Sequence, residues 1–424
     1  MRDNRKDLYI SSLIWIGRGV VLGTMIGICC YILSMAVVFM NKIRTEHFFV
    51  LLFIPLGALL IAWIYNIKGK GFRKSGDLAL DIINEQVLSK INPGRITVKS
   101  DWATDNKGIS PLLGPIVFIT TLITHLVGGS NGKEGAGVQI GTSLACFQAD
   151  LERRIFRKKY DPKEMETWLI VGAGAAFGAL FNAPITGTMF GLHVACPTNN
   201  RFESWIPCLS CNVTSCYVAS YLGIPVIAIP FISSVEITVP MLVLCMLLGI
   251  VAGFIGRLFI FSTHIFSRLS KKISKNEYKK VLISSLVLTV FAVGIQLLTG
   301  ESWYNGFGLE LFSDSTWYSF ILKILLTSMA TACGFTGGEV VPALVIGAAA
   351  FRPLAAFLPI PAATLAMFGC VGVLSGSSKL PLVGTLMAFE VFGFTNPILI
   401  FIVCSFSFIS SGNFSIYKHQ MKLI

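Results

Sequence analysis

Two glutamates lie in glycine-rich segments that are bordered by long uncharged stretches. Glu134 belongs to the sequence GGSNGKEGAGVQIG at residues 128–141, and Glu339 follows Gly337 and Gly338. A carboxylate at membrane depth is costly unless it faces protein or water, so it marks an ion or proton pathway. Glycines leave neighbouring backbone N–H groups accessible, and N–H groups at the start of a helix attract anions. These residue types predict a pathway on which anions and protons meet.

A structural role is the alternative for each carboxylate. Glu134 would then only cap a short loop at the membrane surface, and Glu339 would pair with Lys323 or Arg352 to balance a buried charge. Both alternatives predict that transport coupling survives loss of the carboxylate.

The composition places these segments in a membrane protein. Of 424 residues, 54% are hydrophobic and 13% are charged, and the mean hydropathy is +0.72, whereas soluble domains carry about 25% charged residues. The net charge of +12 comes from basic loops at residues 68–74, 153–159 and 268–280, and segment 301–315 is predicted to lie outside. Basic loops of this kind are cytoplasmic. The pattern predicts a multi-pass protein of the cell membrane, with both termini cytoplasmic and no nucleic-acid partner.

Apolar segments of two kinds position the glutamates. Spanning segments are predicted at residues 8–40, 48–66, 109–127 and 281–300, and further apolar segments lie at 205–235 and 237–266. Shorter ones lie at 316–332, 340–351, 362–375, 380–389 and 396–411, while segment 168–199 breaks at Asn182-Ala183-Pro184. Short, broken helices at membrane depth are tolerated only where protein or a water-filled cavity covers them, and they mark transporter binding sites.

Three short motifs recur in the same order in the two halves of the chain. Leu22-Gly23 with Gly27 matches Leu248-Gly249 with Gly253, residues 132–141 resemble residues 337–347, and residues 184–188 match residues 381–385. We therefore expect one transport domain over residues 1–424, built from related repeats at about 8–200 and about 205–417. This repeat places Glu134 and Glu339 in corresponding positions.

Enzyme and metal interpretations find little support. Cys208 and Cys211 form a CxxC pair, but no second pair or histidine completes a zinc site, and the histidines have no metal-binding spacing. Glycine patterns at residues 17–23 and 172–178 imitate dinucleotide fingerprints inside apolar spans, where helix packing explains them. We expect no metal, no cofactor and no enzymatic activity, and rank a membrane enzyme built on the two cysteines third.

The glutamate motifs resemble those of a known family. Gly132-Lys-Glu-Gly135 followed by Val138-Gln-Ile-Gly141 resembles the gating-glutamate motif of the CLC anion channels and transporters, and Phe181-Asn-Ala-Pro184 with Gly187 resembles the next signature of that family. Residues 129–134, 334–342 and 415–417 are similar to the fluoride/proton antiporter branch, which has a glutamate at position 339 where chloride-carrying relatives have an apolar residue.

This resemblance implies an all-α polytopic membrane protein with the CLC fold, in which two inverted repeats consist of tilted and broken helices. It implies a homodimer in membrane lipid with one ion path per subunit. Glu134 is then the gating and proton-carrying residue, Glu339 a second site on the route, and Tyr417 a pore-lining phenol. The anion-binding residues that it implies are Ser75, Gly76, Gly132, Lys133, Gly135, Gly337, Gly338, Val340, Val341 and Tyr417.

Several positions depart from the family pattern. Family chloride transporters have a serine between glycines where this chain has Ser75-Gly76-Asp77, and Val341 stands where the fluoride branch often has threonine. Val194, preceded by His193, aligns with the internal proton glutamate of chloride/proton exchangers, so Glu339 is the available proton route. No cytoplasmic regulatory domain is expected after Tyr417.

The sequence favours export of fluoride in exchange for protons. Fluoride is small and tightly hydrated, so its dehydration needs converging N–H groups, a phenol and helix N-termini. The alternative is a CLC-type chloride channel or chloride/proton exchanger. Two subunits are expected to associate through the helices that follow Asn182 and Lys379.

Overall fold

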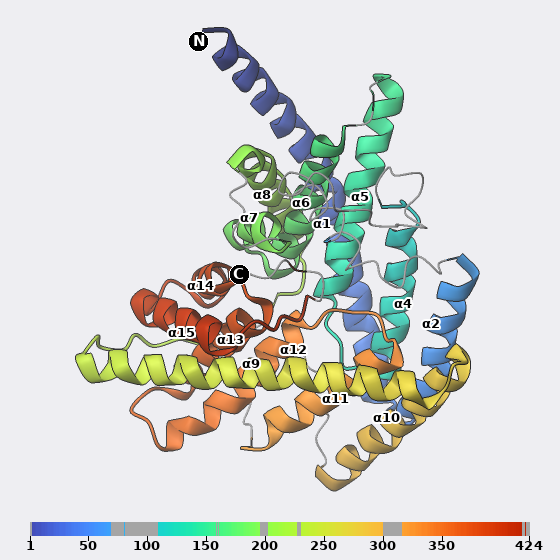
Figure 1. The fold of residues 1–424 in the computed structure, drawn as a ribbon, viewed down its shortest axis with the longest axis vertical. Coiled ribbons are helices and arrows are strands. Elements are labelled where there is room, and N and C mark those ends of the chain that lie inside the picture. The colour runs from blue at the N-terminus through green and yellow to red at the C-terminus, as the bar shows by residue number, and fades with distance from the viewer. Residues whose placement is uncertain are drawn as a thin grey trace.

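The computed structural model describes residues 2–68, 80, 109–157, 159, 161–195, 202–226, 230–299, 316–417 and 420. The regular elements in this part of the chain are helices (Figure 1). The α-helices are α1 (Arg2–Glu46), α2 (Ile54–Lys68), α4 (Leu113–Val127), α5 (Glu134–Ile155), α6 (Pro162–Phe181), α7 (Pro184–His193), α8 (Trp205–Tyr221), α9 (Val239–Ile273), α10 (Glu277–Thr299), α11 (Ser319–Cys333), α12 (Val340–Phe351), α13 (Ala362–Ser378), α14 (Pro381–Phe392) and α15 (Pro397–Ser410). Short 3-10 helices cover Phe48–Phe53, Phe202–Ser204 and Arg352–Ala356.

Four helical segments in the described residues are long and apolar enough to cross a membrane. They are Ser11–Glu46, Phe48–Ile67, Val239–Ile273 and Glu277–Leu298, which confirms the spans predicted at residues 8–40, 48–66 and 281–300. Long helices also bear large apolar side chains on their exposed sides, such as Leu247 and Val290. These surfaces suit lipid tails, which exert no penalty on an exposed apolar side chain.

In two of the predicted apolar segments, the helix covers only part of the apolar sequence. The helix in segment 109–127 begins only at Leu113 and has 15 residues, or about 22 Å, less than the roughly 30 Å of a bilayer core. The prediction of a complete span there is wrong. The apolar segment 205–235 is helical only to Tyr221, because Gly223 takes a positive φ of 83° and turns the chain.

The two halves of the chain pack their helices in the same order. In the first half α1 packs on α6 and α8, α5 on α6, and α6 on α7 and α8; in the second half α9 packs on α13 and α15, α12 on α13, and α13 on α14 and α15. In Figure 1 helices α6 to α8 lie above α9 to α15, and α2 packs against α10. These matched contacts support the predicted repeat.

Equivalent glycine contacts show which residues of the two halves correspond. A Cβ on Gly141 would lie 2.3 Å from the carbonyl oxygen of Gly172, and one on Gly347 would lie 2.0 Å from that of Gly369. The backbones of α5 and α6, and of α12 and α13, therefore touch at a pair of glycines. In a membrane the hydrophobic effect does not drive helices together. Small residues allow close backbone approach, and the resulting van der Waals packing holds the helices to one another.

The same register corrects one prediction about the two glutamates. Helix α5 begins at Glu134 with Lys133 as its N-cap, whereas α12 begins at Val340 with Glu339 as its N-cap. Glu339 therefore corresponds to Lys133, and Glu134 corresponds to Val340. The sequence match was one residue out of register, because it aligned glutamate with glutamate instead of the helix starts.

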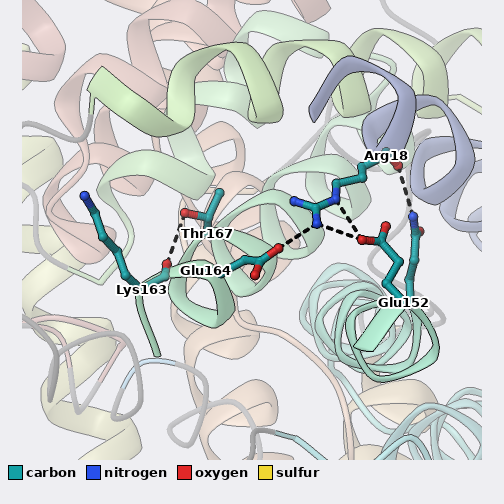
Figure 2. A network of polar contacts seen from close by, with 6 residues as sticks. Arg18, Glu152, Lys163, Glu164 and Thr167 are labelled. Carbon is teal, nitrogen blue, oxygen red and sulfur yellow. Dashed lines mark hydrogen bonds and ion pairs between the residues drawn. The ribbon is translucent and has the colours of Figure 1, made fainter. Parts of the chain in front are cut away.

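An ion-pair network holds one end of α5 (Figure 2). Arg18 of α1 pairs with Glu152 near the end of α5 at 2.8 Å and with Glu164 in the first turn of α6 at 2.6 Å. Its guanidinium also lies 4.6 Å from the Trp15 ring centre and 5.3 Å from that of Trp168. A guanidinium has several donors in a fixed plane, so it can hold two carboxylates at once. Arg18 thus fixes α5 at the end opposite Glu134.

Candidate functional site

The N-terminal ends of α5 and α12 meet head to head. Gly132 N–H donates to the Gly338 carbonyl at 2.8 Å, and Gly338 N–H donates to the Gly132 carbonyl at 2.6 Å. A Cβ on Gly135 would lie 2.5 Å from Gly338 Cα, and a Cβ on Gly338 would lie 2.4 Å from Gly135 N. Glycine is therefore required on both sides. The junction points the positive ends of two helix dipoles at the same region.

Two left-handed glycines bring these helix starts together. Helix α4 ends at Gly128 with φ 94°, and α11 ends at Gly334 with φ 86°. The segments that follow are tied across the two halves, because Thr336 N–H donates to the Thr124 hydroxyl oxygen at 3.1 Å. Each half thus supplies a helix, a sharp turn and a second helix start.

A cavity of about 390 Å³ opens beside this junction. Of the residues predicted for the site, seven line it: Glu134, Gly135, Gly337, Gly338, Glu339, Val340 and Tyr417. Gly132 and Val341 lie next to the Glu134 side chain rather than on the cavity wall. Ser75 and Gly76 lie outside the described residues. The structure therefore brings together the residues from three separate parts of the sequence.

The Lys133 side chain does not line the cavity. It is buried and its Nζ donates to the Ser34 hydroxyl of α1 at 2.9 Å. Its ammonium group is therefore directed to a neighbouring helix rather than to the cavity, and anion binding by Lys133 stays a prediction. Lys133 still sets a positive charge beside Glu134.

The Glu134 carboxylate is folded back over the backbone that precedes it. Its side chain is 3% exposed, and Oε2 is buried without a hydrogen-bond partner among the described residues. A Cβ on Gly132 would lie 2.3 Å from this oxygen and 3.2 Å from Val341 Cβ. Buried polar atoms normally have partners, and exceptions occur at functional sites. The carboxylate is thus buried at the cavity wall, with one oxygen that has no hydrogen-bond partner among the described residues.

Tyr417 reaches the cavity from the end of the described chain. Its ring lies edge-on to Phe190, with centroids 6.2 Å apart, and Phe190 stacks on Phe177 at 4.1 Å. These aromatic residues form one wall together with Val194 and Ile416. Glu339 lines the same cavity as Tyr417. A phenol O–H and a second carboxylate therefore face the same space.

A group of polar residues that also lines the cavity was not predicted from the sequence. Asn131 Nδ2 donates to the Thr331 hydroxyl oxygen at 3.2 Å, and the hydroxyls of Tyr65 and Thr336 lie 3.4 Å apart. All four residues line the cavity. Isolated hydroxyl residues inside apolar segments form no recognisable sequence motif, so their proximity at the cavity could not be predicted.

Outside the cavity, the cysteine pair lies in an apolar environment. Cys208 and Cys211 are fully buried in α8, and the described residues include no cluster of three or more histidine, cysteine or acidic side chains placed for a metal ion. Buried thiols of this kind behave as small hydrophobic residues. His193 lies near the end of α7, with Nδ1 3.1 Å from the Met189 carbonyl oxygen.

The broken helices, the meeting of two helix N-termini and the carboxylate-lined cavity define an all-α ion-transport protein of the membrane. A profile of the voltage gated chloride channel family matches residues 86–412, so the chain belongs to this family, the CLC channels and transporters. The predicted CLC fold is confirmed.

Relatives of known sequence cover nearly all of the chain. It is 26% identical over 427 residues to a "Chloride/fluoride channel protein" of Pseudomonas syringae pv. tomato, covering 99% of this chain and 89% of the relative. It is also 25% identical to the "H(+)/Cl(-) exchange transporter ClcA" of Salmonella arizonae, covering 87% and 79%.

Solved structures share the fold. A crystal structure of a CLC-type fluoride/proton antiporter superposes with a TM-score of 0.85 at 25% identity, over 97% of this chain and 98% of that one. A slow cyanobacterial Cl−/H+ antiporter superposes with a TM-score of 0.71 at 17% identity, over 94% of each chain. At 17% identity, the match to the cyanobacterial antiporter supports the shared fold and nothing about function.

Alanine at the two bridging glycines is expected to have different effects. In Gly132→Ala the new methyl meets mainly Glu134 Oε2, the free end of a side chain, so the fold should survive while the carboxylate is displaced. In Gly338→Ala the methyl meets Gly135 backbone, which should cost about 3 kcal/mol in overpacking. Thermal unfolding of the purified variants, together with anion efflux, measures both effects. Equal unfolding midpoints for the two variants would contradict the difference in packing between the two glycines.

Proposed function

We propose that the protein exports fluoride in exchange for protons across the cell membrane and is not an enzyme. The observation that carries this proposal is the cavity lined by Glu134, Glu339 and Tyr417 at the junction of two helix N-termini. The likeness to a CLC-type fluoride/proton antiporter over 97% of the chain supports it. Basic loops between the spans support cytoplasmic termini.

Anion binding follows from the donors around the cavity. A fluoride ion gives up a tightly held water shell, which must be replaced by hydrogen-bond donors. The Tyr417 phenol, the hydroxyls of Thr331 and Thr336, and backbone N–H groups at the starts of α5 and α12 are available for this. Fixed donors in a confined site need no reorganisation when the ion arrives.

Proton coupling follows from movement of Glu134. A carboxyl group ionises where it faces water and protonates in a drier place, and each state favours a different side-chain position. Glu134 in the cavity would compete with an anion for the same donors, and its withdrawal would carry a proton. Glu339 offers the next carboxylate, because Val194 lines the cavity where chloride/proton exchangers place theirs.

Chloride transport is the second candidate. Val341 supplies no hydroxyl beside the Glu134 side chain, and the ClcA relative is an H(+)/Cl(-) exchange transporter by name. Comparison of fluoride and chloride efflux from proteoliposomes, with pH recorded, decides between the two. Proton uptake that accompanies fluoride loss supports fluoride/proton antiport, and chloride efflux without a pH change favours a chloride pathway.

Glu134→Gln is expected to abolish proton coupling. Glutamine keeps the shape and hydrogen-bonding capacity of the side chain but carries no titratable proton and no negative charge. Fluoride movement should therefore stall or become an uncoupled leak. Fluoride and proton fluxes recorded together in proteoliposomes test this. Retained stoichiometric exchange in this variant would refute the mechanism, while a stability loss of about 1 kcal/mol with coupling intact is what a capping role predicts.

Glu339→Gln tests the second carboxylate separately. If Glu339 lies on the proton route, the variant should impair proton movement coupled to fluoride, because a carboxyl group that can take up and release a proton is lost. If Glu339 only balances Lys323 or Arg352, coupled fluxes should match those of the wild type. The same flux assay distinguishes the two roles.

We also propose a homodimer that joins through α7 and α14. The two helices pack together, and Glu390 of α14 accepts hydrogen bonds from the N–H groups of Ile185 at 2.9 Å and Thr186 at 2.6 Å at the start of α7. Ile185 near the start of α7 and Leu382 near the start of α14 are 49% and 45% exposed. The pair of helices therefore presents one rigid apolar surface to a second subunit.

A large side chain on this surface should weaken the dimer. Ile185→Trp is expected to shift the protein toward the monomer, because the added volume cannot be accommodated between two packed surfaces. Light scattering in detergent and cross-linking in lipid measure the oligomeric state. Leu247→Trp, on the exposed side of α9, is the matched control and should leave the dimer intact. A wild-type monomer under both conditions would rule the interface out.

A further inference from the structure

A buried lysine joins the C-terminal ends of two helices. Lys379 ends α13 in the left-handed conformation, with φ 64°, and is 8% exposed. Its Nζ donates to the Phe408 carbonyl in the last turn of α15 at 3.0 Å and to the Ser411 hydroxyl at 2.5 Å. No carboxylate pairs with it among the described residues. A cation is favourable here, because the free carbonyls at helix C-termini carry partial negative charge.

Ser411 is also the first residue of a strap that leads to Tyr417. We define this strap as residues 411–417. It crosses α13 again at its far end, where Ile416 N–H donates to the Ser377 carbonyl at 2.9 Å. Between these points the Arg257 guanidinium lies 5.4 Å from the Phe414 ring centre. The strap therefore starts at the end of α15, which Lys379 ties to α13, and it is contacted by Arg257 in its middle and by α13 at its end.

The equivalent position in the first half lacks this arrangement. Asn182 ends α6 with φ 52°, as Lys379 ends α13, and both are followed within two residues by a proline that starts the next helix. Asn182 is exposed. Asparagine adopts the left-handed conformation readily, and lysine rarely does. A lysine is therefore not needed for the turn itself, and its contacts to α15 give the reason for its presence.

We propose that Lys379 is a positioning residue for the anion site, which holds the strap so that the Tyr417 phenol faces the cavity. The inference rests on the proposed role of Tyr417 as an anion donor. The Tyr417 N–H donates to the Ser415 hydroxyl oxygen within the strap at 3.1 Å, so the place of the phenol depends on the strap. Loss of the Lys379 contacts unties the end of α15 from α13, which loosens the start of the strap and allows the phenol to leave its position against Phe190. A phenol that moves stabilises small, strongly hydrated anions less than larger ones.

Lys379→Met tests the proposal, because methionine keeps an unbranched apolar side chain but lacks the ammonium donors. Hydrogen–deuterium exchange followed by mass spectrometry should show amide exchange of the strap rising about tenfold, the equivalent of one charge-assisted hydrogen bond. Peptides from α5 and α6 should be unchanged. In proteoliposomes the ratio of fluoride to chloride efflux should fall severalfold. Lys379→Arg, which retains a cation with N–H donors, should restore both.

Lys163→Met is the matched control, since Lys163 makes an exposed ion pair with Glu203 at the start of α6. If amide exchange of the strap is unchanged in Lys379→Met, or rises equally in the control, then Lys379 does not hold the strap and the proposal is overturned. Faster strap exchange with an unchanged anion ratio overturns its link to the anion site. If Lys379→Met fails to fold, Ser411→Ala removes one acceptor and should give a smaller shift of the same sign, and no shift overturns the proposal. Absence of fluoride transport in the wild type refutes the proposed function instead. The amide exchange of the strap and the chloride efflux then still show whether Lys379 holds the strap.

Discussion

The structure depends on backbone contact between the first turns of α5 and α12. Gly132 and Gly338 exchange two hydrogen bonds, and Gly135 and Gly338 approach so closely that neither can carry a side chain. Two helix N-termini repel each other as dipoles, so such a junction forms only where the surrounding helices force it. The glycine contacts of α5 with α6 and of α12 with α13 supply that force, and Arg18 fixes the far end of α5. The positive potential that results is what an anion path requires.

The fold was predictable from the sequence to the extent that its causes are local. The length of the apolar segments predicted the long helices α1, α9 and α10, and Asn182 with Pro184 predicted the break between α6 and α7. The ends of α4 and α8 were missed, because an apolar segment does not reveal where a backbone turn interrupts it. Arg18 was visible as a charge in an apolar span, but its partners are 134 residues or more away and no local rule connects them.

The candidate site was predictable where glycine and a charge occur together. Glu134 and Glu339 stood out in this way, whereas Tyr417 was implied only by the family resemblance, and all three line the cavity. The direction of the Lys133 side chain could not be predicted, because the residue type suits an anion, whereas the contact with Ser34, 99 residues away in the chain, depends on the fold. Asn131 and Thr331 were missed for the opposite reason, since their types are common in loops and helices and only their meeting in space makes a polar wall.

Function in this chain is carried by the differences between two similar halves. At the helix starts the equivalent positions hold Lys133, whose ammonium is directed away from the cavity, and Glu339, which lines it. At the later turn they hold Asn182 and Lys379, and only the second is tied to α15. The shared contacts build a symmetric scaffold and so set where two helix dipoles converge. The unequal residues then place a carboxylate, Glu339, on the cavity wall at one helix start, and a lysine tie beside the segment that leads to Tyr417.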